Sequence, residues 1–568
     1  MVTISFQKID YAIFILTLLL TFLVGAFYSI FKKQNTAEEY LHGGRSMNLF
    51  VVAFSIISGA ISIQIITIPT EIYYYGINSF VGSIITSPLV GLTTYFLIFP
   101  VFYKLQLTSI YTYLELRFDR KVKLLSSFIF AVQIIVSFPI ITYIPALIVS
   151  YVSNINVYVI TYSLNSLCII YTLFGGIKAV IWTDALQLLF MLICLFGAVL
   201  VGFVRLGIWN IFKTASDTER LKIVLDLDPT KRDTLWIAIG GCYFQILGLM
   251  GFGQGSIQKY LSLKKYSDVK WACSIAFVGI MLIFTLSAFS GIIPLHQYVY
   301  CDPLISKKIR KPDQLLTHYI MDPEIRFSGL AGLFVSGIIS ASLSTLSSGL
   351  NSVTATVYSD FLKPYLSKNV IEKYETICLK LLVLIFGILC ISCAYMVKYL
   401  ENNIFPVFVS FIALTNGPMA GLFIAGLFIT KINAKGAFYG GLISLIFMGW
   451  LVITSQWYQM QGLVKFPTLP LYTNNCGITF ENVSNVKHNQ SQNENVSSIF
   501  KLPHFLFPVI GSCTVLILGF LISCFTKTEN DENVPDEYLS PLAHCIRKKC
   551  NISSYKSVLD VREECDSK

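Results

Sequence analysis

A run of hydroxyl side chains between Ser336 and Asp360 is the part of the sequence best suited to bind an ion. Eleven of these 25 residues are Ser or Thr, and only the last residue is charged. Polar side chains recur there every three or four residues, which places them on one face of a helix. They are Ser340, Ser344, Ser347, Ser348, Asn351 and Thr354. Several neutral oxygens on one face suit a small hard cation, and we predict that the adjacent Ser344 and Thr345 bind one.

An alternative stays open for every single Ser of this segment. A hydroxyl inside a membrane also serves to join packed helices, or bonds back to the carbonyl one turn earlier in its own helix. In both cases the residue is structural and binds no ion. The rest of the chain must therefore supply the other ligands before a cation site is established.

The hydroxyl-rich segment must lie in a membrane, because the chain around it is too apolar for a soluble protein. Of the 568 residues, 55% are hydrophobic and 13% are charged, about half the charged fraction of soluble domains. The apolar runs are about 20 residues long, which is the length of helix that crosses a bilayer, and they lack the alternation of barrel strands. We therefore predict an all-α polytopic membrane protein.

The basic residues indicate how the chain crosses the membrane. The net charge is +10, but it does not indicate nucleic-acid binding, because most Lys and Arg gather in alternate short loops as they do on the cytoplasmic side of membrane proteins. These loops contain Lys32 and Lys33, Arg117 to Lys123, Lys259 to Lys270, Lys363 to Lys373, and Lys431 to Lys435. Placing them inside predicts an extracellular N-terminus and a cytoplasmic C-terminus in the plasma membrane.

About thirteen transmembrane helices follow from the apolar runs. The first is expected to be retained, because its basic pair follows the run and no small-residue cleavage site comes after it. The predicted spans are 11–31, 49–70, 79–103, 124–152, 157–174, 179–204, 234–255, 271–296, 329–360, 376–398, 404–430, 435–456 and 505–525. The loop 457–503 then lies outside.

That loop carries a glycosylation pattern that agrees with its predicted position. Asn482, Asn489 and Asn495 each begin an Asn-x-Ser triplet, the acceptor pattern for N-glycans. The similar triplet at Asn551 lies in the predicted cytoplasmic tail and should be unused. Cys301 and Cys476 also fall in predicted outside loops, where disulfides form, but the sequence does not establish that they pair with each other.

Two predicted spans contain polar or glycine-rich interruptions at membrane depth. The span 49–70 includes Ser58, Gly59, Ser62, Gln64 and Pro69, and the stretch 240–255, five spans later, is rich in Gly. Transporters with inverted repeats break two corresponding helices in this way and bind ions or solute at the freed backbone. We predict a five-plus-five core.

The predicted organisation has four parts. Residues 1–47 hold the extracellular N-terminus, the first helix and a cytoplasmic loop, and residues 48–430 form the transport core. Residues 431–525 contain two additional helices and the glycosylated loop, and residues 526–568 form the cytoplasmic tail.

The segment from Gly175 to Gln187, GGIKAVIWTDALQ, resembles the signature of the sodium/solute symporter family. Other motifs are similar, in order, to the branch that holds the sodium-coupled monocarboxylate, multivitamin and iodide transporters. They are Ile68–Gly76, Pro100–Lys104, Thr112–Phe118, Tyr143–Leu147, Gln258–Tyr260, Cys301–Pro303, Lys311–Gln314 and Leu343–Thr345. The resemblance covers roughly residues 40 to 455. It implies a LeuT-like inverted-repeat core and alternating access driven by Na⁺.

The resemblance also implies particular site residues. The main sodium site falls on the hydroxyls of Ser344 and Thr345 and on backbone carbonyls near Ser58 and Ile61. A second ion or substrate region, completed by the second interrupted span, is also expected. Its predicted members are Ser62, Gln64, Tyr143, Met250, Gln254 and Ser348.

The chain departs from these relatives at positions expected to contact the solute. Where relatives typically have Tyr-x-x-Asn-Gln, this chain has Met-Gly-Phe-Gly-Gln at residues 250–254, and Ile246 stands at a Trp position of the iodide transporter. Pro406 and Val409 replace polar and aromatic residues of that transporter. We interpret this as favouring a small organic anion, above all a monocarboxylate. A vitamin, iodide, and a sensor that binds solute without moving it remain as alternatives.

Asp184 is an ionisable residue at the inner end of a predicted span, which makes it a candidate ion-path carboxylate. The alternative is a helix-start carboxylate that is solvated at the cytoplasmic face and paired with Lys178. An enzyme would need a clustered catalytic constellation, and a channel would need a pore loop or charged rings. We predict instead a sodium-coupled symporter with no cofactor, whose partners are Na⁺, a small organic anion and the lipid bilayer.

Overall fold

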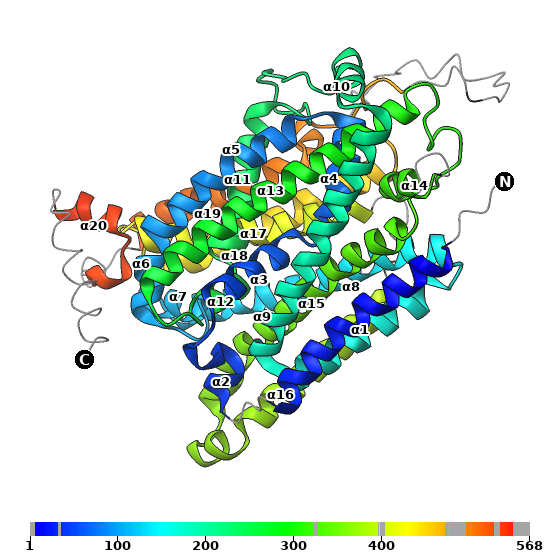
Figure 1. Cartoon of the computed structure of the whole chain (residues 1–568). Coiled ribbons are helices and arrows are strands. Elements are labelled where there is room, and N and C mark those ends of the chain that lie inside the picture. Colours follow the sequence, from blue (N-terminus) through cyan, green and yellow to red (C-terminus); the bar gives the residue numbers. More distant parts are fainter. Residues whose placement is uncertain are drawn as a thin grey trace.

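The structure is a computed structural model that describes residues 6–31, 36–322, 327–395, 397, 404–471, 476, 496–526 and 534–548. Every regular element in these ranges is helical (Figure 1), as the long apolar runs predicted. Ten helices in these ranges are long and apolar enough to cross a membrane, or up to twelve when each of two bent pairs counts as one span. The all-α fold is confirmed, and the number of thirteen spans is not.

The helices fall into three groups. The long ones are α1 (Lys8–Phe31), α5 (Asn78–Thr93), α8 (Arg120–Ser153), α9 (Val157–Leu206), α13 (Tyr266–Tyr298), α15 (Leu330–Val357), α16 (Lys368–Ala394), α17 (Ile404–Phe428), α18 (Ala434–Met460) and α19 (Phe507–Phe525). Two interrupted helices consist of α3 (Leu49–Ile61) with α4 (Gln64–Tyr75), and of α11 (Leu235–Ile246) with α12 (Gln254–Tyr260). The short ones are α2 (Ala37–His42), α6 (Phe99–Leu105), α7 (Tyr111–Arg117), α10 (Ile208–Asp217), α14 (Leu315–Met321) and α20 (Pro541–Lys548).

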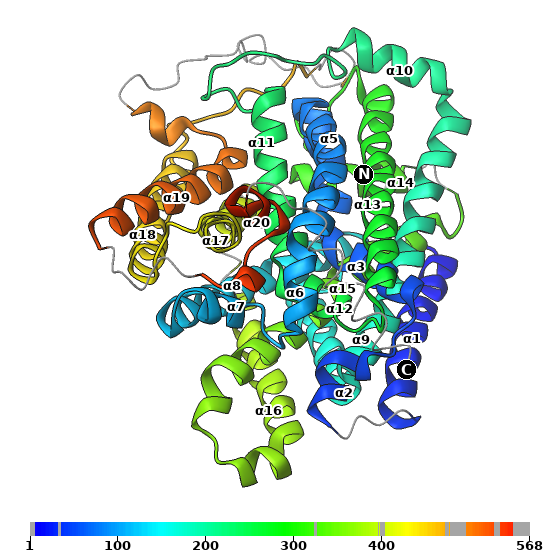
Figure 2. The same cartoon turned by 90° about the vertical axis from the view of Figure 1, so that its left-hand side faces the viewer.

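The hydroxyl-rich helix α15 lies at the centre of the bundle. In its most apolar stretch 89% of the residues are buried, and it contacts α9, α8, α1 and α3. Figure 2 shows α17, α18 and α19 together on one side of the bundle, and these three helices contact one another. In the same view α10 lies at one end of the bundle, and α2 and α16 lie at the other.

Both predicted helix breaks are present. Between α3 and α4, Ser62 has φ 42° and ψ −132°, which is unusual for a residue with a side chain. Between α11 and α12, a π-helical turn (η3, Leu247–Gly251) precedes a bend of 51°. A Cβ at Gly253 would lie 1.9 Å from the Leu249 carbonyl oxygen, so only glycine fits there.

A third break separates two of the predicted spans. The 50-residue element α9 contains the predicted spans 157–174 and 179–204, and it is interrupted between them at Gly176, which has φ 51° and ψ −157°. A straight helix of that length would extend about 75 Å, whereas the hydrocarbon core is about 30 Å thick. The break is therefore needed for both halves of α9 to lie within the membrane.

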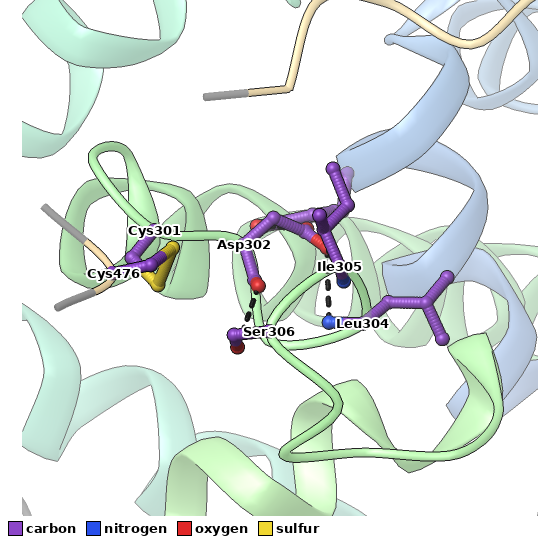
Figure 3. The surroundings of a disulfide bond; sticks show 7 residues. Cys301, Asp302, Leu304, Ile305, Ser306 and Cys476 are labelled. Atoms are coloured by element: carbon purple, nitrogen blue, oxygen red, sulfur yellow. Dashed lines mark hydrogen bonds between the residues drawn. A yellow bond between two sulfur atoms is a disulfide. The ribbon is translucent and has the colours of Figure 1, made fainter. Parts of the chain in front are cut away.

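A disulfide between Cys301 and Cys476 links segments 175 residues apart in sequence (Figure 3). The neighbouring Asp302 accepts hydrogen bonds from the backbone N–H groups of Leu304 and Ile305 and from the Tyr73 hydroxyl at 3.0 Å. Both cysteines thus lie near the far end of α4. The acceptors Asn482, Asn489 and Asn495, and also Asn551, fall outside the described residues, so their glycosylation stays a prediction.

Candidate functional site

The hydroxyls of α15 meet the backbone of α3 just before its break. Ser344 Oγ donates to the Ser58 carbonyl at 3.0 Å, and Thr345 Oγ1 donates to the Gly59 carbonyl at 3.4 Å. Both hydroxyls also lie near the Ala341 carbonyl of their own helix, at 3.3 and 3.1 Å. The structure therefore brings Ser58, Ser344 and Thr345 together, as predicted for the sodium site.

Ile61 belongs to the same region through its backbone. It is the last residue of α3, and its side chain is buried. The last four carbonyls of an α-helix lack donors within the helix, and in α3 these are the carbonyls of residues 58–61. The break at Ser62 thus leaves a set of carbonyl oxygens available next to two hydroxyls, an arrangement of neutral oxygens that suits a cation such as Na⁺.

A cavity of about 200 Å³ lies beside this contact. Four of the predicted site residues line it: Ser62, Gln64, Met250 and Thr345. In the part of the chain that the structure describes, Ser62 Oγ and Gln64 Oε1 are buried without a hydrogen-bond partner. A buried polar atom left unpaired costs about 1–3 kcal/mol, so a solute with polar groups that satisfies these atoms would be stabilised there.

The positions where this chain departs from its relatives face the same cavity. Ile246, Met250 and Val409 all belong to its lining. Apolar side chains thus form this part of the cavity wall. The side chain of Pro406 lies outside the described part of the structure.

A second cavity of about 130 Å³ adjoins the first and is lined by Gln254, Lys259 and Ser348. Three polar residues line both cavities: Thr345, Gln133 and Asn416. Gln133 Nε2 on α8 donates to Asn416 Oδ1 on α17 at 3.2 Å. Sequence reasoning missed this pair, although an amide in each of two apolar spans is a recognisable sign of a polar path.

Two of the predicted substrate residues, Tyr143 and Gln254, do not line the first cavity. Tyr143 is buried against the ring of Tyr158, with ring centroids 6.3 Å apart, and it lines neither cavity. Gln254 is buried in the second cavity wall, where its Oε1 accepts from the Ile110 N–H and its Nε2 donates to the Thr108 carbonyl, both at 2.8 Å. Its amide therefore ties α12 to the segment before α7.

Asp184 is fully buried and joins four helices. Its Oδ2 accepts from Ser55 Oγ at 2.8 Å, from Lys259 Nζ at 2.9 Å and from Ser348 Oγ at 2.9 Å. Its Oδ1 accepts from Ser347 Oγ at 3.2 Å. The predicted member Ser348 is thus bonded to Asp184.

Two expectations from the sequence are wrong here. Asp184 is not a solvated carboxylate paired with Lys178, and Lys259 is not a charge of a cytoplasmic loop, because its side chain is only 5% exposed. Each charge is buried because the other neutralises it and hydrogen bonds satisfy the rest. The two residues are 75 positions apart, which no local pattern reveals. A role of Asp184 in an ion path stays a prediction.

Residues 40–444 match the family model of the sodium:solute symporter family. The chain belongs to this family. It is 31% identical to sodium-coupled monocarboxylate transporter 2 of Bos taurus over 548 residues, 95% of this chain and 88% of that protein. It is 35% identical to a putative sodium-dependent multivitamin transporter of Drosophila melanogaster over 458 residues, 78% of this chain and 74% of that protein. These relatives are transporters and not enzymes.

A solved structure supports the fold. The chain superposes on a Na⁺-coupled sialic acid symporter, in its substrate-bound outward-open state, with a TM-score of 0.73. The match covers 92% of this chain and 98% of that one at 24% sequence identity. The predicted LeuT-like architecture is therefore confirmed. Membership of the sodium:solute symporter family makes Na⁺ and a solute its partners in the bilayer.

Proposed function

We propose that this symporter imports a small organic anion, most of all a monocarboxylate, with Na⁺ as coupling ion and no cofactor. The observation that carries the proposal is the cavity lined by Thr345 of α15 together with Ser62 and Gln64, whose buried Oγ and Oε1 atoms have no hydrogen-bond partner among the described residues. Its volume of about 200 Å³ is below the range of about 300–1,000 Å³ typical of sites for drug-sized ligands. The monocarboxylate transporters among the relatives support the same solute class.

The sodium site is proposed to consist of Ser344 and Thr345 with backbone carbonyls near Ser58 and Ile61. Neutral hydroxyls and carbonyls replace the hydration oxygens of Na⁺ without binding it too tightly for release. An ion held between α15 and α3 stabilises the arrangement in which the two helices are close. Because Thr345 also lines the solute cavity, this arrangement is the one that solute binding favours, which couples the two.

Solute selectivity is proposed to depend on Gln64 and Met250, which line the cavity at the two helix breaks. Asp184 is proposed as an ion-path carboxylate, which a cation reaches when Lys259 moves away from it. A vitamin is the second candidate solute, and the relative in Drosophila melanogaster favours it.

We further infer a plasma-membrane location with the N-terminus outside and the C-terminus inside. The basic loops support this orientation. The Cys301–Cys476 disulfide supports it as well, because disulfides persist in oxidising compartments. The end of the bundle with this disulfide is then the outer end.

Tracer uptake tests the solute assignment. Cells that express the protein are given short monocarboxylates, biotin, pantothenate and iodide, each in Na⁺ medium and in choline medium. We expect monocarboxylate uptake that requires Na⁺. Uptake of biotin or pantothenate alone would replace the proposal with the vitamin alternative, and binding without accumulation would identify a sensor.

A further inference from the structure

A buried ion pair lies at the far end of the solute cavity from the sodium site. Glu71 on α4 lines the cavity, and Arg232 lies three residues before α11. Arg232 Nη2 is 2.7 Å from Glu71 Oε1 and 2.6 Å from Oε2. The two side chains are 7% and 11% exposed, so water screens their attraction little.

The guanidinium of Arg232 is held in place but retains binding capacity. It lies over the ring of Tyr75 at 3.6 Å and over that of Phe466 at 5.9 Å, which are favourable cation–π positions. Its Nε is buried and has no hydrogen-bond partner among the described residues. A guanidinium binds carboxylates through adjacent N–H groups, so Arg232 keeps an N–H group that the pair with Glu71 leaves unused.

The ion pair connects the two interrupted helices. α4 is the half of the first one that follows its break, and α11 is the half of the second one that precedes its break. α4 ends and α11 begins at the proposed outer end, where Tyr73 at the end of α4 bonds to Asp302 beside the disulfide. Separation of these two halves, which would open the cavity to a solute from outside, requires that Arg232 leaves Glu71.

We propose that the Glu71–Arg232 pair is the outer gate of the transport path, and that the substrate's carboxylate opens it by replacing Glu71 on Arg232. This inference rests on the proposed function. Removing one partner of a buried ion pair leaves an uncompensated charge, which is strongly unfavourable. A substrate carboxylate has the charge and shape of the Glu71 carboxylate, so the exchange keeps Arg232 neutralised while α4 and the start of α11 move apart. A neutral solute cannot do this, and the gate therefore selects anions.

Uptake kinetics of charge variants test the gate. Glu71→Gln removes the competitor for Arg232, and the half-saturating concentration of a monocarboxylate should fall. Arg232→Gln removes the docking point and should raise it about tenfold or more, because hydrogen bonds to a charged group are lost. Arg232→Lys keeps the charge, so its half-saturating concentration should lie between those of the wild type and of Arg232→Gln. All values are normalised to protein at the cell surface.

The exposed pair of Lys222 and Glu219 in the same loop provides the matched control. Its side chains are 63% and 58% exposed, so Lys222→Gln should leave the half-saturating concentration unchanged. Equal or same-direction changes in Glu71→Gln and Arg232→Gln, in a wild type that transports monocarboxylates, would overturn the gate alone. Absence of Na⁺-driven carboxylate uptake by the wild type would instead overturn the proposed function.

Thiol labelling keeps the test decisive if a charge variant transports poorly. Thr67 is buried and lines the cavity below Glu71, so Thr67→Cys reports access from outside to a membrane-impermeant thiol reagent. The gate predicts faster labelling when Glu71→Gln is added to Thr67→Cys, relative to Thr67→Cys alone. It also predicts that a monocarboxylate, but not its neutral amide, changes the labelling rate of Thr67→Cys. Identical rates under all these conditions would overturn it.

Discussion

Replacing Ser344 by Ala removes the hydroxyl that lies 3.0 Å from the Ser58 carbonyl. If that hydroxyl is a sodium ligand, its loss should cost about 1–3 kcal/mol of ion binding, which corresponds to an increase of roughly 5- to 150-fold in the half-saturating Na⁺ concentration. Ser344 is fully buried, so water cannot take the place of its oxygen. We therefore expect the upper part of this range for Ser344→Ala.

Thr345→Ala should have a smaller effect of the same sign. Thr345 is partly buried and lines both cavities, so a water molecule has access to the vacated position and can supply an oxygen. Thr345→Ser keeps the hydroxyl and should restore a curve close to that of the wild type. The order of the two Ala variants thus follows from the burial of the Ser344 and Thr345 hydroxyls.

The assay is the Na⁺ activation curve of tracer uptake, normalised to protein at the cell surface. Ser342→Ala is the matched control, because the Ser342 hydroxyl is also buried in α15 but donates to the Ile141 carbonyl at 2.9 Å, on the face toward α8. It should lower surface expression without altering the curve. Unchanged Na⁺ curves for both Ser344→Ala and Thr345→Ala would refute the sodium assignment and leave helix packing as the role of these hydroxyls.

Three further predictions concern orientation, selectivity and pH. Removing Asn482, Asn489 and Asn495 together should abolish the N-glycan shift on a gel, and a shift that depends on Asn551 would reverse the orientation. Met250→Tyr should change the ratio of monocarboxylate to vitamin uptake more than the Na⁺ dependence, and an unchanged ratio would exclude Met250 from the solute site. Burial raises the pKa of Asp233 to about 7 from the usual 3.8, so the folded protein binds this proton more tightly than the unfolded chain. The resulting stability is present below about pH 4 and is lost as the pH rises through about 7. The Tm in detergent should therefore fall between pH 5 and pH 8, and less so for Asp233→Asn.

The sequence predicted those parts of the site that depend on local patterns. Hydroxyls at helical spacing identified the face of α15 that meets α3, and the polar interruptions of 49–70 identified the break that the structure places at Ser62. Both are visible locally because a helix repeats every 3.6 residues and a break needs unusual residues. The family motifs then added the pairing of Ser344 with Ser58, which spacing alone does not provide.

The parts that sequence reasoning missed depend on contacts between distant segments. Lys259 stands at the edge of a basic loop in the sequence, and only the position of Asp184 on another helix explains its burial. Gln133 and Asn416 meet across α8 and α17, 283 residues apart. The break of α9 at Gly176, by contrast, lies between the predicted spans 157–174 and 179–204, because the apolar run is interrupted locally by two glycines and Lys178.

Thr345 occupies the position from which ion and solute binding can be coupled. Its hydroxyl contacts the backbone of α3 at the break, and its side chain lines both the cavity with Gln64 and the one with Lys259. An ion beside it would hold α15 against α3 and thereby fix one wall of both cavities. On the same helix, Ser348 is bonded to the buried Asp184 that also holds Ser55 of α3. α15 and α3 are thus joined at two levels, by neutral oxygens at the proposed sodium site and by a neutralised carboxylate next to it. The connection through Asp184 does not depend on the ion, so it would keep the two helices assembled while the sodium site fills and empties.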